Sequence, residues 1–131
     1  MSQENIDAGH AFIEAVNRGD VDAAVQLCHP ALVFEPLRAA TEGAFLGRDG
    51  IRQFLADTST TFEVFRVDVT DLRDLGDKVL GLGSIRIRGR AGGVETDIPA
   101  AAIAQFRDGL LWRYKDYGQP QEALEAAGLS E

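Results

Sequence analysis

The stretch from Val94 to Gly118 constrains the fold of this chain more than any other part of the sequence. Two apolar, β-prone runs, VETDIPAAAIAQF and LLWRYKDYG, flank the tripeptide Arg107-Asp108-Gly109. This pattern is typical of a β-hairpin with a three-residue loop, in which the glycine takes the left-handed conformation. We therefore expect two long antiparallel strands joined at this tripeptide.

The predicted register of this hairpin places small residues on one strand opposite aromatic and acidic residues on the next. Side chains alternate between the two faces of a strand, so residues at every second position share a face. A pairing of Phe106 with Leu110 puts three alanines and their three partners on one face: Ala100, Ala102, Ala104, Trp112, Tyr114 and Asp116. We interpret this face as a cavity wall that contains one carboxyl group.

Charges indicate a second register, across the turn at 91–93. Pairing Arg88 with Glu95 also pairs Arg86 with Asp97, and opposite charges directly across two strands stabilise such an alignment. These charged residues are interpreted as solvated cross-strand ion pairs on the face away from the cavity.

The same alignment extends the small-residue face onto the preceding strand. It places Gly81 beside Ala102 and Gly83 beside Ala100. The two glycines either widen the cavity or mark bulges that bend the sheet, and a bent sheet satisfies both interpretations.

The spacing of apolar residues predicts the other elements, because helices repeat every three to four residues and strands every two. Asp20 is in position to cap a helix with its side-chain oxygen. The predicted elements, in chain order, are helices over 5–18 and 20–28, a strand over 31–35, a helix over 48–58, strands over 62–74 and 78–90, the hairpin, and a short helix over 121–129. This order predicts an α+β fold with three N-terminal helices on one face of a strongly curved, mainly antiparallel sheet.

Length and net charge limit the number of domains and the kinds of binding partner that we expect. A chain of 131 residues forms one domain, and its net charge of −8 argues against nucleic acid and against an anionic membrane surface. No apolar run approaches the roughly 20 residues of a membrane-spanning helix. The first ten residues lack the basic and apolar segments of a signal peptide, so we expect none.

The single cysteine, Cys28, lies in an apolar context that predicts a buried structural thiol. One cysteine allows no internal disulfide and suits a reducing compartment, so a cytoplasmic location is expected. The two histidines are far apart and give no metal-ligand spacing. We expect neither a metal nor a cofactor.

An apolar strip is predicted on the sheet face opposite the cavity. It contains Leu80, Leu82 and Ile103, with Ala101 and Arg113 beside them. If helices cover only the cavity side, this strip is too large to remain exposed. We therefore predict a homodimer in which two such faces meet about a twofold axis.

Four short motifs occur in a characteristic order: NRGD at 17–20, GRDGI at 47–51, FRDG at 106–109 and EALEAAG at 122–128. Together with the order of elements they resemble the SnoaL-like branch of the nuclear transport factor 2-like superfamily, which also contains the ketosteroid isomerases. The resemblance spans residues 1–131 as a single domain and implies a conical fold, a deep apolar pocket and frequent dimers. Members include isomerases, polyketide cyclases, epoxide hydrolases, dehydratases and binding modules, so the fold alone selects no function.

Two enzyme templates give partial matches. Val33-Phe34-Glu35-Pro36 resembles the first-strand motif of the steroid isomerases and puts Glu35 at the base, but the two donor positions that stabilise the enolate carry Phe12 and Ala102. Classical steroid isomerisation is therefore not expected.

The second template is the limonene epoxide hydrolases. Lys115-Asp116-Tyr117 resembles their last-strand motif and puts Asp116 at the catalytic acid. The companion Arg-x-Asp motif aligns with Gly83-Ser84-Ile85, so the triad that activates water is absent.

Two functional hypotheses follow. In the first, the protein is an acid–base isomerase, cyclase or dehydratase that acts on an apolar small molecule. Glu35 is the base, Asp116 the acid or orienting group and Tyr114 the hydrogen-bond donor. Burial raises the pKa of a carboxyl group, which makes it a usable acid or base near neutral pH. In the second, the same pocket belongs to a non-catalytic ligand-binding or dimerisation module. The predicted ligand-binding residues are Phe12, Val33, Phe54, Ala100, Ala102 and Trp112.

Overall fold

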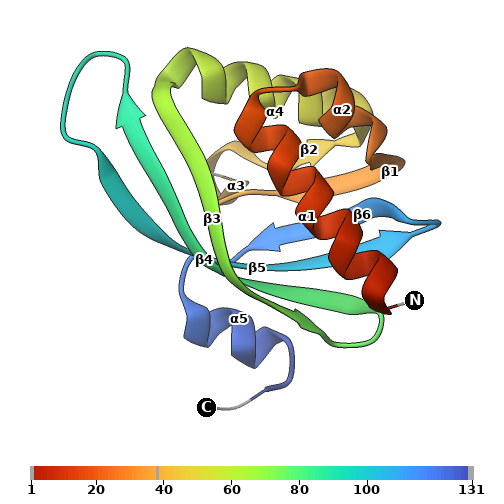
Figure 1. The fold of residues 1–131 in the computed structure, drawn as a ribbon. Coiled ribbons are helices and arrows are strands. Elements are labelled where there is room, and N and C mark those ends of the chain that lie inside the picture. Colours follow the sequence, from red (N-terminus) through yellow and green to blue (C-terminus); the bar gives the residue numbers. More distant parts are fainter. Residues whose placement is uncertain (1, 38, 130–131) are drawn as a thin grey trace.

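Helices and strands follow one another in nearly the predicted order (Figure 1). The computed structural model describes residues 2–37 and 39–129. Its elements are α1 (Ser2–Arg18), α2 (Val21–Gln26), β1 (Cys28–Glu35), α3 (Ala39–Glu42), β2 (Phe45–Leu46), α4 (Gly47–Thr61), β3 (Phe62–Asp74), β4 (Lys78–Gly89), β5 (Thr96–Arg107), β6 (Leu110–Asp116) and α5 (Pro120–Ala126). The predicted α+β class is confirmed.

The six strands form one open, mixed sheet in the order β2-β1-β6-β5-β4-β3. Neighbouring strands are antiparallel except β1 and β6, which are parallel. The parallel pair brings the first long strand of the chain beside the last, so residues near position 34 lie next to residues near position 114.

Helices α1, α2 and α4 lie on one side of the sheet, here called the inner face (Figure 1). The main core lies between them and includes Phe12, Val25, Ile51 and Phe54. Full burial of such a side chain stabilises the fold by about 1.5–3 kcal/mol. The predicted cap is confirmed, because the Asp20 side chain accepts a hydrogen bond from the backbone N–H of Ala23 at 3.1 Å.

The Asn17 side chain of helix α1 also bonds to β3, an edge strand of the sheet. Asn17 Nδ2 donates to the carbonyl oxygen of Val67 at 2.9 Å, and Asn17 Oδ1 accepts from the N–H of Val67 at 2.8 Å. The amide thus bonds both backbone groups of one β3 residue, as a neighbouring strand would.

The C-terminal helix α5 lies on the other side of the sheet, here called the outer face (Figure 1). Its Ala123 and Leu124 pack against Leu80, Ala101 and Ile103, which are all buried. The expectation that helices cover one face alone is therefore wrong, and the apolar strip is covered by α5 of the same chain. No helix among the described residues is long and apolar enough to cross a membrane.

The β5–β6 hairpin differs in register from the prediction. Gly109 has the expected left-handed conformation (φ 77°), but Asp108 is left-handed as well (φ 55°), and Arg107 pairs with Leu110 across a two-residue turn. Two consecutive left-handed residues are the signature of the turn that best matches strand twist. Phe106 therefore pairs with Leu111 and not with Leu110.

A β-bulge then shifts the same ladder again. The register changes between Gln105 and Phe106, so Trp112 is the extra residue of β6 and Gln105 pairs with Arg113. Beyond the bulge Ala104 pairs with Tyr114 and Ala102 with Asp116. The total shift is two residues, so the alanines, Tyr114 and Asp116 still share the predicted face.

The β4–β5 register confirms the predicted glycine–alanine pairs, Gly81 with Ala102 and Gly83 with Ala100. A bulge in β3, between Val69 and Asp71, lies opposite Gly83. A Cβ atom on Gly83 would overlap the carbonyl oxygen of Asp68, so this glycine is required for the close approach of the two strands. The bulge interpretation of Gly83 is therefore correct, and the cavity interpretation is correct as well, because both glycines line the cavity described below.

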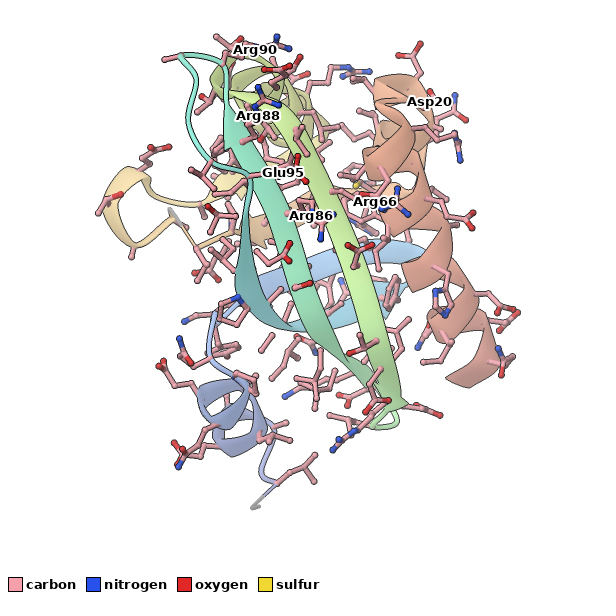
Figure 2. All side chains as sticks on the ribbon, turned by 60° about the vertical axis from the view of Figure 1, so that its left-hand side comes forward. Asp20, Arg66, Arg86, Arg88, Arg90 and Glu95 are labelled. Carbon is pink, nitrogen blue, oxygen red and sulfur yellow. The ribbon has the colours of Figure 1, made fainter. Side chains whose placement is uncertain are left out.

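Charged side chains cover the outer face of β3, β4 and β5 beyond α5 (Figure 2). Arg86 Nε lies 3.0 Å from Asp97 Oδ1 and 3.5 Å from Glu95 Oε2, which confirms the predicted pairing of Arg86 with Asp97. The backbone ladder ends at Ile87, and Arg88 makes its ion pair with Glu63, not with Glu95.

Candidate functional site

A cavity of about 230 Å³ lies between the inner face of the sheet and helices α1 and α4. Its wall is almost wholly apolar, with side chains from α1, α4 and strands β1 and β3–β6. Six predicted site residues line it: Phe12, Phe54, Ala100, Ala102, Tyr114 and Asp116. The alanines and Gly81 and Gly83 leave this space open, because they carry little or no side chain.

Three predicted site residues lie outside the cavity lining among the described residues: Val33, Glu35 and Trp112. In β1 it is Phe34 that faces the cavity, and since side chains alternate along a strand, Val33 and Glu35 face outward. The sequence carried a signal for this orientation, because Leu32 and Phe34 are the bulky apolar residues at alternate positions of ALVFE.

Trp112 leaves the cavity wall because it is the bulged residue of β6. Its ring contacts the guanidinium groups of Arg107 and Arg113, at 3.7 and 4.1 Å from the ring centroid. Leu111 takes the expected place of the tryptophan in the lining. A local bulge of this kind has no simple sequence signature in the stretch LLWRY.

An aromatic cluster closes one side of the cavity. The ring of Phe34 lies 4.8 Å from that of Phe54 and 6.2 Å from that of Phe12, and Phe54 is in turn 6.4 Å from Phe65. Tilted and edge-on contacts at these distances are favourable for aromatic rings. Phe34 and Phe65 were not among the cavity residues predicted from the sequence.

Among the described residues two aspartates line the cavity, and Asp116 is the buried one, only 7% exposed, whereas the Asp68 side chain is 44% exposed and paired with Arg66. Asp116 Oδ1 accepts hydrogen bonds from the backbone N–H groups of Gly118 at 2.8 Å and Ala101 at 3.4 Å. Gly118 has φ 79°, a conformation that turns the chain back toward the aspartate. Burial raises the pKa of Asp116, and the two backbone hydrogen bonds oppose part of that increase.

Tyr114 contributes a phenol group to the cavity lining. Burial raises its pKa, and the nearby charge of Asp116 raises it further, so the phenol stays protonated and neutral. No hydrogen bond joins its hydroxyl group to another described residue. The hydroxyl can therefore donate to or accept from a ligand in the cavity.

None of the described lining residues is a lysine, arginine or histidine. Asp116 therefore has no cation beside it in the cavity, and its charge is opposed only by backbone dipoles. Within the described part of the chain, no group of three or more histidine, cysteine or acidic side chains is arranged to hold a metal ion. The arrangement suits proton exchange and hydrogen bonding with an otherwise apolar molecule.

Cys28 lies outside the cavity lining, and its prediction as a buried thiol is confirmed. The residue is fully buried and its Sγ donates to the carbonyl oxygen of Ala24 at 3.3 Å. Burial raises the pKa of the thiol to about 12, so it carries no reactive thiolate near neutral pH.

Solved structures with the same fold confirm the architecture. TerC, co-crystallised with polyporic acid, is 22% identical over 95% of this chain and 98% of its own, with a TM-score of 0.79. A hypothetical protein from Catenulispora acidiphila with a ketosteroid isomerase-like fold, in complex with trimethylamine, is 20% identical over 93% and 92%, with a TM-score of 0.77. An epoxide hydrolase of the LEH-like type from M. tuberculosis is 18% identical over 96% and 90%, with a TM-score of 0.76.

At these identities the structural likeness shows the fold alone, and no curated protein matches the sequence. The sequence itself matches the family model of the SnoaL-like domain over residues 10–114. That range extends from α1 to Tyr114 in the cavity wall and covers most of the chain. The protein therefore belongs to the SnoaL-like domain family.

Proposed function

We propose that this protein binds an apolar small molecule in its inner cavity and exchanges a proton with it through Asp116. The observation that carries the proposal is the position of Asp116, a buried carboxyl group without a neighbouring cation in a largely apolar wall. The other described aspartate of the lining, Asp68, is 44% exposed and paired with Arg66. Two structural neighbours, TerC and the Catenulispora protein, were crystallised with small molecules, which supports binding of a small molecule by this fold.

The proposed chemistry assigns one role to each polar side chain. Backbone N–H groups fix Asp116 Oδ1, so Oδ2 is the oxygen that gives or takes the proton. Its raised pKa brings the acid and the base form closer to equal populations near neutral pH, which is where proton transfer is most efficient. Tyr114, which stays protonated, donates a hydrogen bond to the oxygen of the ligand on which negative charge develops.

Glu35 has no part in this proposal, because its side chain faces the opposite side of the sheet. The reaction class supported best is therefore one that a single acid–base group can perform, such as isomerisation or dehydration of an apolar molecule. The ligand should not be an anion, since a second negative charge beside Asp116 would be unfavourable in an apolar wall.

A non-catalytic binding module is the second candidate. The observation that favours it is the presence of Phe12 and Ala102 in the cavity lining, where neither side chain can stabilise an enolate. In that case Asp116 and Tyr114 orient a ligand without reacting.

Deuterium exchange distinguishes the two candidates. Apolar ketones with acidic α-hydrogens are incubated with the protein in deuterium oxide, and exchange is followed by NMR, alongside displacement of the neutral dye Nile red from the cavity. Proton chemistry predicts dye displacement and accelerated exchange that Asp116→Asn abolishes. Asp49→Asn, an exposed carboxylate on α4, is the matched control and should exchange like the wild type.

Dye displacement without exchange for any ketone would support the binding module, and failure of the wild type to bind the dye would contradict both candidates. The homodimer remains a prediction, now without the support of an exposed apolar strip, and light scattering tests it. The cytoplasmic location is likewise a prediction, tested by cell fractionation.

A further inference from the structure

A second depression, of about 200 Å³, lies on the outer face of the sheet, beside the end of α5 at Ala126. It is here called the outer groove, and among the described residues it shares Tyr114 with the lining of the inner cavity. The charged lining residues of the outer groove are Lys78, Arg113, Lys115 and Glu35. The uncharged ones are Ile103, Gln105, Tyr114, Tyr117 and Ala126.

The sheet register explains why these cations lie together. Lys78 of β4 pairs with Gln105 of β5, which pairs with Arg113 of β6, so these three side chains form one row across the outer face. Lys115 lies two residues further along β6 and pairs with Glu35 of β1. Strand pairing therefore fixes the spacing of the cations.

The outer groove holds both lysines of the chain, Lys78 and Lys115. Neither lysine, nor Arg113, makes an ion pair with any described carboxylate. Two arginines elsewhere on the outer face are paired, Arg66 with Asp68 at 3.1 Å and Arg86 with Asp97 at 3.0 Å. Figure 2 shows Arg66, Arg86 and Arg88 on that paired part of the face.

Contacts other than ion pairs hold two of the cations in place. Arg113 Nη1 donates to the carbonyl oxygens of Ala31 at 3.2 Å and Trp112 at 3.1 Å, and its guanidinium group lies over the indole ring. Lys115 Nζ lies 5.2 Å from the centroid of the Tyr117 ring. Aromatic contacts stabilise a cation without neutralising its charge, so the positive charge remains available.

Three cations and one carboxylate leave this groove net positive on a protein whose net charge is −8. Grouping like charges is unfavourable, and a bound anion relieves the repulsion. The groove is a small depression between strands and one end of a helix, and its dimensions fit a small molecule better than a flat protein surface.

We propose that the outer groove binds a small molecule through a carboxylate or phosphate group held by Lys78, Arg113 and Lys115. The planar guanidinium group of Arg113 offers two parallel donors to such an anion, and the two ammonium groups complete the contact from either side. The three cations lie on the opposite face of the sheet from Asp116, and the proposal does not rest on the proposed reaction.

Titration of the full chain with inorganic phosphate, and separately with succinate, tests the proposal. Backbone amide shifts in ¹H–¹⁵N NMR spectra should change saturably for the residues of β6 around Arg113 and Lys115. The double variant Lys78→Met/Lys115→Met keeps the apolar stems of the half-buried Lys78 and the exposed Lys115. We expect it to raise the dissociation constant at least about tenfold, equivalent to about 1.4 kcal/mol.

The matched control is Arg66→Met/Arg86→Met, which removes two paired cations from the same face of the sheet. It should leave the dissociation constant within about twofold. Loss of these surface ion pairs should also change the stability of the fold little. The stronger of the two probes identifies the anionic group, phosphate or carboxylate. Absence of saturable shifts with both probes, or equal weakening in both double variants, would overturn the proposal. Saturation by an oligoglutamate peptide without any response to the small anions would also overturn it and indicate a protein partner.

Discussion

The ring of Phe34 stacks on the ring of Tyr114, with 4.5 Å between the ring centroids and 16° between the planes. The two residues are direct partners on the parallel strands β1 and β6. Strand β1, near the start of the chain, thus orients the side chain of Tyr114, which lies near its end. Since the Tyr114 ring is held flat against Phe34, its hydroxyl has a fixed direction in the cavity.

We expect Phe34→Leu to weaken both the fold and this orientation. Loss of one stacked aromatic pair removes about 0.5–1.5 kcal/mol beyond the lost apolar area, so the free energy of unfolding should fall by about 1–3 kcal/mol. Urea unfolding measures the change. Phe62→Leu is the control, because its ring has one aromatic neighbour, Phe65, at 5.9 Å and should cost less. Equal losses of unfolding free energy in the two variants would show that the stacked pair stabilises the fold no more than the contact between Phe62 and Phe65.

Gly83 and Gly81 should differ sharply in their tolerance of alanine. At Gly83 the new Cβ would overlap the carbonyl oxygen of Asp68 and lie 2.9 Å from Val69 Cα, and backbone cannot move aside easily. At Gly81 the nearest atom is Leu72 Cδ2 at 3.2 Å, the end of a flexible side chain. We expect Gly83→Ala to cost about 3 kcal/mol or more and Gly81→Ala about 1 kcal/mol or less in urea unfolding. The reverse order would contradict the β3 bulge.

Substitution of phenylalanine for alanine at two adjacent positions of β5 tests which of them faces the cavity and which faces packed core. Ala102 faces the inner cavity, and Ala101 is fully buried under α5. Ala102→Phe should fold normally, cost about 1 kcal/mol or less and block binding of Nile red. Ala101→Phe should cost about 1–3 kcal/mol or more, because the added ring has no room. If Ala102→Phe unfolds the protein, the space beside Ala102 is not a cavity in solution.

The pKa of Asp116 predicts a pH dependence of stability with a definite sign. The folded-state pKa lies above the ordinary value of 3.8, so between these two values the folded chain binds more protons than the unfolded chain. The free energy of unfolding therefore decreases as the pH rises through this window and levels off above the folded-state pKa.

Asp116→Asn removes this dependence, so its melting temperature relative to the wild type should rise with pH across the same window. Differential scanning calorimetry from pH 4 upward, at about one-unit intervals, resolves the trend, since each pKa unit corresponds to about 1.4 kcal/mol. Asp49→Asn, a change at a fully exposed carboxylate outside the cavity, is the matched control. A difference that falls with pH would mean that the charged form of Asp116 is the favoured one.

Ile103→Glu tests the role of α5 on the outer face. Ile103 packs against Ala123 and Leu124, so a glutamate there would be an unpaired buried charge that costs several kcal/mol. We expect a large loss of stability that does not depend on protein concentration, with no change of oligomeric state in light scattering. Conversion of a wild-type dimer into a stable monomer would instead restore this face as a dimer interface.

Local rules predicted the elements and the β4–β5 register well, because opposite charges at Arg86 and Asp97 fix the alignment directly. The hairpin register depended on a turn type and on a bulge at Trp112, which arise from strand twist and packing and have no simple signature in the sequence. The position of α5 was missed for a related reason. An amphipathic pattern shows that a helix has an apolar face, and it does not tell which side of a sheet that face covers.

The two hydrogen bonds between the Asn17 side chain and the backbone of Val67 affect how readily copies of this protein can associate through their sheets. β3 is the outermost strand on its side of the sheet, and an outermost strand offers free N–H and C=O groups to any other strand that approaches. At Val67, near the middle of this strand, both groups are already bonded to the Asn17 amide. A strand from a second molecule would have to displace that amide before it could pair there, so one side chain of α1 protects the chain against aggregation through its longest strand.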